Sequence, residues 1–402
     1  MTMMSKSLYD ITQDYVKQNI DIYKENALKI HSHPETSNHE FKSSKILADQ
    51  LEKEGFSVKF DVAGHRTGFD ARYKSQKPGP TLVFLAEYDA LANLGHGCGH
   101  NLFGNYSSLA AVAVKQVLDE TGGEIRVYGT PGEEGGENGS AKESFVREGF
   151  FADVDAALCV HPSSYVSRTN HALANDPVDI EFFGKSSHAA GNPEGGVSAL
   201  TPLIQTFIGI DAYRLRIHDD VSIHGVILDG GKAANVIPDY TRGRFYIRAK
   251  NRKKLDEIRE DIKRIAEGQA ISTGTQLKFG LFQNKVDDMI LTPRLDDLFF
   301  KNAEKVGIRL EDIHQPTNEG LGSSDVGNVS HVVPTIQPTV SISDKTIPPH
   351  SLEFVEAAKS EKGLASIEQA STLLAWTAID LLTDDDELNA IKKEHAKNQL
   401  VD

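Results

Sequence analysis

Residues 81–89 read TLVFLAEYD, an apolar run that ends in acidic residues. An unbroken apolar run is typical of a strand buried on both faces, and the acids indicate that its carboxyl end opens into a polar site. Residues 124–130 (EIRVYGT) and 155–162 (DAALCVHP) have the same form, and the segment between them, SAKESFVREG (140–149), favours a helix. Strands that alternate with helices predict an α/β domain with a mostly parallel sheet.

The pattern changes near residue 174. Strand-like and helix-like segments then follow in the order β-α-β-β-α-β, which is the ferredoxin-like unit; they span 177–190, 195–217, 221–231, 239–250, 253–270 and 275–285. The α/β pattern resumes near residue 290. We therefore expect an α/β domain of residues 1–173 and 290–402, interrupted by an α+β domain of residues 174–289. The charged residues 384–400 are expected to form a solvated tail.

Composition excludes several classes of partner. The 402-residue chain has a formal net charge of -15, which disfavours nucleic acid and anionic membrane surfaces. No stretch approaches the ~18 apolar residues of a membrane-spanning helix, and residues 1–16 lack the apolar core of a signal peptide. Two cysteines in a chain of this length fit reduced thiols. The sequence thus predicts a cytoplasmic protein with a small-molecule partner.

The loop GHGCGHN at residues 95–101 places Cys98 and His100 two positions apart. Thiolate and imidazole both bind Zn²⁺ or a similar ion, and the flanking glycines let the backbone fold around a metal. A flexible loop with surface histidines explains the pattern equally well when it is taken alone. A dinucleotide site is disfavoured, because a cysteine and two histidines stand where a diphosphate needs clearance.

The segment PGEEGGENG at residues 131–139 follows the strand 124–130 directly. It places Glu133 and Glu134 at the carboxyl end of that strand. Adjacent carboxylates repel each other, whereas a nearby cation would stabilise one and leave the other to accept a proton. An acidic surface turn is the alternative, and it is common in a chain this negative.

Two histidines complete the candidate set. His161 ends the strand 155–162, and His350, in IPPHSLEF, precedes a long helix. Singly, His161 reads as a core histidine and His350 as a loop residue beside a helix start. Three predicted strand ends and one helix start each carry a ligand type, however, and α/β sheets place their sites at such ends. The coincidence favours one shared metal site.

Eight motifs resemble, in order and spacing, those of the aminoacylase and glutamate-releasing carboxypeptidase family of co-catalytic metallopeptidases. They are LAEYDAL, GCGHN, PGEEGG, CVHP, GKSSHAA, GGKAANVIP, LGSSDVGNVS and IPPHSLEF. The likeness is to the amidohydrolase branch, which includes aminobenzoyl-glutamate, auxin-conjugate and hippurate hydrolases. It covers nearly the whole chain and implies a catalytic metal-binding domain with an inserted lid and dimerisation domain.

The resemblance also implies residue roles. Two divalent metal ions, Zn²⁺ or Mn²⁺, would be held by Cys98, His100, Glu134, His161 and His350. Glu133 would be the general base, and Asp89 would orient the ligands. Other branches carry a histidine where this chain has Glu87. Which ligand bridges the metals therefore stays open.

In the inserted domain the resemblance gives His188 the role of stabilising the oxyanion of the tetrahedral intermediate. Asn235 and Arg248 match positions that hold the substrate carboxylate or backbone, where a planar guanidinium suits bidentate pairing. Taken alone, Asn235 reads equally well as a turn residue and Arg248 as a surface strand residue. The resemblance further implies a homodimer or homotetramer assembled through the lid domain.

The resulting expectation is hydrolysis of amide bonds in N-acyl or aryl-amino acids, or in small peptides, by a metal-activated water with Glu133 as base. One alternative is a dipeptidase or aminopeptidase that acts on short peptides. A more remote alternative is a non-catalytic metal-binding protein. The last would be expected to lack the base or a ligand, and every one is present in this sequence.

Overall fold

The computed structural model describes residues 6–217, 220–318 and 321–400, which form two compact units. The larger unit consists of residues 1–171, 289–321 and 325–402, and the smaller unit of residues 172–288 and 322–324. The expected boundaries, 173/174 and 289/290, lie one or two residues later in the chain. The return of residues 322–324 to the smaller unit has no counterpart in the sequence pattern.

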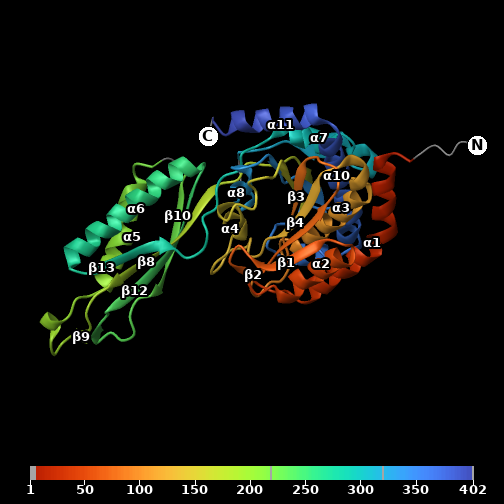
Figure 1. Cartoon of the computed structure of the whole chain (residues 1–402). Helices are drawn as coiled ribbons and strands as arrows, with labels where there is room; N and C mark the ends of the chain where they lie inside the picture. The colour runs from red at the N-terminus through yellow and green to blue at the C-terminus, as the bar shows by residue number, and fades with distance from the viewer. Residues whose placement is uncertain (1–5, 218–219, 319–320, 401–402) are drawn as a thin grey trace, which may run out of the picture. The chain divides into compact units, whose positions relative to one another are not determined.

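The main sheet of the larger unit has six strands in the order β1-β2-β4-β3-β5-β15. Figure 1 labels β1 to β4 of this sheet. β4, β3, β5 and β15 run parallel, and β1 and β2 form an antiparallel hairpin at the β4 edge. The predicted mostly parallel sheet is confirmed. The strands are β1 (Ser57–Val62), β2 (His65–Lys74), β3 (Thr81–Ala86), β4 (Glu124–Gly129), β5 (Ala156–Leu158) and β15 (Thr335–Ile336). A second, four-stranded sheet contains β6 (His161–Ser163), β7 (Val166–Ser167), β14 (Ile313–His314) and β16 (Thr339–Ser341).

Three long helices pack against one another and define the core of the larger unit: α1 (Leu8–Ser32), α3 (His100–Thr121) and α10 (Glu361–Thr383). The run LAAVAV in α3 is fully buried, because small side chains let this helix lie close to β3, β4 and both neighbouring helices. The remaining helices are α2 (Phe41–Lys53), α4 (Ala141–Arg147), α7 (Pro293–Phe300), α8 (Val326–Ser330), α9 (Leu352–Ala357) and α11 (Asp385–Asn398), with 3₁₀ turns at Ala303–Val306 and Leu310–Asp312.

The prediction of a solvated tail after residue 384 is wrong. Residues Asp385–Asn398 form α11, which is capped by the Asp384 side chain and buries Leu388, Ile391 and His395. His395 Nε2 lies 2.6 Å from the Ser330 carbonyl oxygen. The high charge density of the segment concealed a sparse apolar face at helical spacing.

The smaller unit has the predicted β-α-β-β-α-β order. Its antiparallel sheet, β10-β12-β8-β13, packs against α5 and α6. Residues of β12 alternate strictly between buried and half-buried, as expected for a sheet covered by helices on one face. The elements are β8 (Ala174–Phe183), α5 (Leu200–Arg214), β10 (Ser222–Asp229), β12 (Tyr240–Ala249), α6 (Arg252–Thr273) and β13 (Gln276–Leu281), together with the short pair β9 (Ser187–His188) and β11 (Val236–Ile237) and a 3₁₀ turn at Pro193–Gly195. In the described part of the chain, no helix combines the length and apolarity needed to cross a bilayer.

Candidate metal centre

The candidate ligands come from four separate segments of the larger unit. Cys98 lies in the loop before α3 and His100 is the first residue of that helix, while Glu133 and Glu134 lie in the loop after β4. His161 begins β6, and His350 lies just before the Ser351 cap of α9. The loop turns into α3 through Gly99, at φ 77°, where a Cβ atom would lie 2.6 Å from Pro162 Cγ. Only glycine fits both this dihedral angle and this approach.

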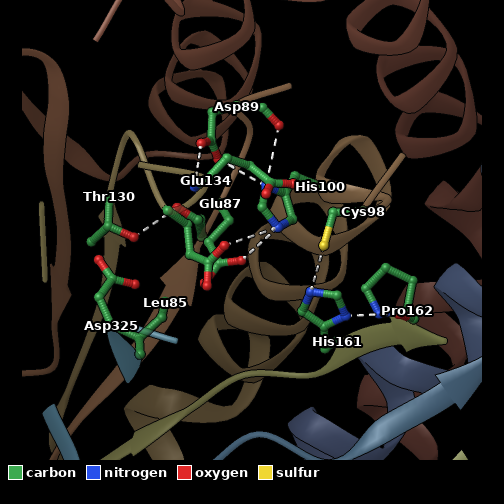
Figure 2. A network of polar contacts seen from close by, with 12 residues as sticks. Leu85, Glu87, Asp89, Cys98, His100, Thr130, Glu134, His161, Pro162 and Asp325 are labelled. Carbon is green, nitrogen blue, oxygen red and sulfur yellow. Dashed lines mark hydrogen bonds and ion pairs between the residues drawn. The ribbon is translucent and has the colours of Figure 1, made fainter. Parts of the chain in front are cut away.

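The side chains form three groups of candidate ligands, of which the third is Glu87, His100 and Glu133, and the first two share one atom. Figure 2 shows Cys98, His100 and His161 of the first group. The first is Cys98, His100 and His161, and the second is Cys98, Glu134 and His350; within each group the ligand atoms lie within 4.8 Å of one another. The Cys98 Sγ atom is 3.5 Å from His161 Nε2, and His350 Nε2 is 3.4 Å from Glu134 Oε2. The sulfur common to both groups is therefore the candidate bridge, a question that the sequence left open.

Asp89 holds two of these residues at once. Its Oδ1 atom lies 2.8 Å from His100 Nδ1, and its Oδ2 atom accepts a hydrogen bond of 2.9 Å from the backbone N–H of Glu134. The first contact places the proton of a neutral His100 on Nδ1 and turns the Nε2 lone pair toward the site. Asp89 is fully enclosed at 1% exposure, so this geometry is shielded from water.

His350 has a left-handed backbone, with φ 58°. Its N–H donates a hydrogen bond of 2.9 Å to the Gly97 carbonyl in the cysteine loop. A non-glycine residue in this region is held there by its surroundings, commonly at a functional site. The backbone bond ties the last candidate ligand in the chain to the first.

A buried ion network lies beside the two groups. Lys142 Nζ is 2.6 Å from Asp325 Oδ1 and 2.8 Å from Glu87 Oε1, and all three side chains are fully buried. Glu87 Oε2 is in turn 3.1 Å from His100 Nε2, with Glu133 Oε2 at 3.9 Å from the same nitrogen. Glu87 is thus connected to the candidate centre, although sequence reasoning gave it no role.

The residues fit divalent cations on two observations. Among the described residues, the buried Glu134 Oε1 atom has no hydrogen-bond partner, and the buried His100 Nε2 atom faces the carboxylates of Glu87 and Glu133 at 3.1 and 3.9 Å. Orphaned polar atoms are costly unless another ligand satisfies them. In addition, carboxylates gather around one buried ammonium, that of Lys142; they belong to Glu87, Asp89, Glu133, Glu134 and Asp325. Two divalent cations would offset this excess of negative charge.

Burial governs the proton affinities. It raises the pKa of Glu134 to about 7, and it raises the pKa of Glu133 well above its usual range with help from the Glu87 charge. A nearby cation would lower both pKa values again. Burial also lowers the pKa of His161 to about 4, so the ring stays neutral near pH 7 and keeps a lone pair for a metal.

The larger unit brings together seven of the residues that the sequence singled out, and the other three lie in the smaller unit. His188, Asn235 and Arg248 belong to the smaller unit. His188 pairs with Val236 between β9 and β11, and the Asn235 carbonyl accepts from the Ala189 N–H at 3.0 Å. The Arg248 guanidinium lies 5.1 Å from the ring centroid of Tyr246. Their roles at a catalytic site stay predictions.

Sequence reasoning missed Lys142 and Asp325 as members of the site. Asp325 stands in the quoted motif LGSSDVGNVS, which was a signal that could have been used. No sequence signal pointed to Lys142, because a lysine near the start of a helix usually lies on the protein surface. Only folding reveals that this lysine is enclosed.

Comparison with known proteins identifies the class. The peptidase dimerisation domain of M20 peptidases matches residues 177–273. The chain is 30% identical to the Xaa-Arg dipeptidase of Mus musculus over 317 residues, which cover 78% of this chain and 73% of that protein. It is 36% identical to a p-aminobenzoyl-glutamate hydrolase polypeptide of Escherichia coli over 294 residues, which cover 68% of this chain and 60% of that protein.

A solved structure agrees at the level of the fold. A dinuclear metal-binding peptidase of the M20 family from Bacillus subtilis superposes with a TM-score of 0.55 at 18% identity, covering 90% of this chain and 99% of that one. Fold and site together define a metallopeptidase-type hydrolase. The chain belongs to the M20 peptidase family, which confirms the resemblance stated from its motifs.

Proposed function

We propose that this protein is a two-metal amidohydrolase that cleaves the amide bond of N-acyl or aryl-amino acids. The observation that carries the proposal is the pair of ligand groups that share Cys98, with Glu133 beside them. Thiolate and imidazole ligands favour zinc, whereas the carboxylates also suit manganese. The substrate assay therefore uses both zinc-loaded and manganese-loaded protein.

Two divalent metals, when bound, lower the pKa of a water molecule and polarise the scissile carbonyl. The chain supplies the remaining functions. Glu133, whose side chain is 11% exposed, takes the proton from the attacking water and returns it to the leaving amine. Asp89 fixes His100 and Glu134 in place through its two oxygens. His188 would stabilise the oxyanion of the tetrahedral intermediate, and Asn235 and Arg248 would bind the substrate carboxylate or backbone.

A dipeptidase is the second candidate function. It is supported by the similarity to an Xaa-Arg dipeptidase, just as the amidohydrolase is supported by the similarity to a p-aminobenzoyl-glutamate hydrolase. Both reactions break an amide bond with the same catalytic groups. They differ only in the residues that contact the two halves of the substrate.

The test is a substrate panel assayed on one protein preparation. Aminobenzoyl-glutamate, N-acetyl amino acids and dipeptides are offered to protein loaded with zinc or with manganese, then after chelation and after metal add-back. We expect about two metals per chain and turnover that chelation abolishes. Turnover that is indifferent to chelation, with no bound metal, would sink the proposal. A preference for dipeptides would select the second candidate.

The base is tested separately with Glu133→Ala. We expect turnover to fall below detection while metal content stays near normal, because Glu133 belongs to neither ligand group that contains Cys98. Glu137→Ala is the matched control, since it is an exposed glutamate of the same loop. Retained turnover in the Glu133 variant would rule out its role as base.

We further infer that two copies associate through the smaller unit. β10 is an edge strand of its sheet, and Val226, Ile227 and Leu228 on it are between 45% and 57% exposed. The neighbouring helix α5 exposes Ile208 at 62%. An apolar edge strand left open is an aggregation hazard unless a partner covers it.

Light scattering on a sizing column tests this association. The wild type should run as a dimer, or as a tetramer if a second interface exists, and Ile208→Asp should dissociate it. Ile271→Asp is the control, because Ile271 is also an exposed isoleucine, 83% exposed, but it lies on α6. A monomeric wild type, or a variant that stays dimeric, would contradict the inference.

A further inference from the structure

The loop that carries Glu133 and Glu134 turns repeatedly through left-handed backbone and is strained at two of its residues. Five of the ten residues 131–140 have positive φ angles: Gly132, Gly135, Gly136, Asn138 and Ser140. For Asn138 and Ser140 this backbone is unfavourable, and each costs on the order of 1 kcal/mol unless neighbours enforce it. Within the loop, a bond of 2.7 Å from the Ser140 N–H to the Gly132 carbonyl closes its two ends. Further backbone bonds, from the Gly135 N–H to the Gly132 carbonyl at 3.2 Å and from the Gly139 N–H to the Gly136 carbonyl at 2.9 Å, fold the segment between them, and side chains from outside the loop add to these contacts.

A segment about 100 positions earlier in the chain makes hydrogen bonds to the loop. Residues 37–40, named here the clamp segment, lie just before α2. Glu40 is fully buried, and its Oε1 atom accepts hydrogen bonds from the Gly132 N–H at 3.0 Å and the Asn38 N–H at 2.8 Å. Its Oε2 atom accepts from the Thr67 hydroxyl at 2.8 Å. Glu40 therefore fixes the residue next to Glu133.

Asn38 holds the far side of the same loop. Its amide Nδ2 donates to the carbonyl oxygens of Glu137 at 3.1 Å and Asn138 at 2.9 Å. Its Oδ1 lies 2.7 Å from His65 Nδ1, which fixes the orientation of the amide. The clamp segment is thus bonded to the loop both before and after the two glutamates.

The packing leaves the loop little room to shift. A Cβ atom on Gly132 would lie 2.4 Å from Ser37 Oγ, so clamp segment and loop are in direct contact. The Glu134 N–H, held by Asp89, is the next fixed point along the chain. Glu133 lies between these two anchors, and its carboxylate position follows from both.

We propose that Asn38 and Glu40 are positioning residues that act through the 131–140 loop to set the Glu133 carboxylate for proton transfer. The proposal rests on the proposed role of Glu133 as base. Neither side chain belongs to a candidate ligand group. Weakening the clamp should therefore lower kcat while metal content and KM remain, because a base displaced by about 1 Å loses about 100-fold in rate.

The principal variant is Asn38→Asp. It keeps the size of the side chain, its tolerance of the left-handed φ of 60° and its contact with His65, but it replaces the two N–H donors to the loop by an oxygen. We expect kcat to fall about 10- to 100-fold on whichever panel substrate the wild type hydrolyses. Amide hydrogen exchange in residues 132–140 should accelerate about tenfold or more.

Glu40 is tested by a pair of substitutions. Glu40→Ala removes the acceptors and should behave as Asn38→Asp does. Glu40→Gln keeps an oxygen toward the Gly132 and Asn38 N–H groups and places an amide toward the Thr67 hydroxyl, which can accept. It should restore kcat to within about threefold of wild type. Should the alanine variant fail to fold, Asn38→Asp and the glutamine variant decide the matter.

The matched control is Glu35→Gln. Glu35 is a glutamate five residues earlier whose carboxylate accepts from the Lys42 and Ser43 N–H groups, and so it stabilises the start of α2 without reaching the loop. Its replacement should lower the melting temperature and leave kcat unchanged.

Each outcome decides for or against the positioning role. Lowered kcat with retained metal, faster exchange in the loop and an inert control support it. Wild-type kcat in Asn38→Asp, or loss of metal in parallel with activity, overturns it. An active Glu133→Ala would instead refute the proposed base, and the exchange measurement would still report whether the clamp holds the loop.

Discussion

Removal of the buried Lys142 ammonium should destabilise the larger unit severely. In Lys142→Met the carboxylates of Asp325 and Glu87 lose a cation at 2.6 and 2.8 Å, and all of these side chains are fully buried. Loss of one partner from a buried ion pair costs about 3–5 kcal/mol, because the remaining charge stays desolvated. That is a large part of the roughly 5–15 kcal/mol that stabilises a folded protein.

Thermal unfolding measured by circular dichroism is the assay. At about 2–4 °C per kcal/mol, the first transition should fall by roughly 6 to 20 °C. Adding Asp325→Asn should recover part of the loss, because one of the two stranded charges is removed. Lys362→Met is the control: Lys362 lies 2.7 Å from Asp344, but it is 40% exposed, so it should move the transition little. A Lys142 variant that melts within about 2 °C of wild type would refute the reasoning.

Three further expectations concern single sites. Cys98→Ser should lower the metal content from about two to below one per chain, because the first two ligand groups both contain this sulfur. Elemental analysis measures the metal content, and two retained metals would contradict a shared thiolate. Burial lowers the pKa of His65 to about 4, so its contribution to the free energy of unfolding is full above pH 6.5 and falls as pH drops toward 4. Urea unfolding should show a loss of up to about 2 kcal/mol between pH 7 and 5 that His65→Gln lacks, and equal losses in both proteins would exclude His65 as the source. Gly104→Ala should lower the free energy of unfolding by about 1–3 kcal/mol, because the added Cβ would lie 2.5 Å from Leu47 Cδ1 and 2.8 Å from the Glu87 carbonyl oxygen. This loss exceeds the gain in helix propensity of about 1 kcal/mol. A higher urea midpoint in the variant would contradict the prediction.

The sequence predicted the fold class and the gathering of most site residues, for a reason that can be stated physically. Glu133 lies four residues beyond β4, followed by Glu134, and His161 lies three residues beyond β5. β4, β3 and β5 are neighbouring parallel strands, so their carboxyl ends meet at one edge of the sheet. A ligand type at the end of a buried strand therefore carries positional information that can be read directly from the amino-acid sequence.

Contacts between distant segments carried no such information. Lys142 and Asp325 are 183 positions apart, and the Asn38 bond to Asn138 spans 100. Neither pair shows a periodicity or motif that links its members. The same holds for α11, whose three buried residues are sparse among charges. These features depend on which surfaces meet after folding, which local pattern does not record.

The insertion of the smaller unit also orders events during synthesis. Five of the six residues nominated as ligands or base occur by position 161, but His350 follows the whole inserted unit, and so do β15 and β16, which pair with β5 and β6. The ribosome synthesises the chain from its N-terminus, so the other candidate ligands emerge long before His350 does. The group of Cys98, Glu134 and His350 is complete only after the inserted unit has been synthesised. With the proposed ligand set, full metal loading would have to follow synthesis of the inserted unit, and the Cys98 thiol would have to stay reduced until then.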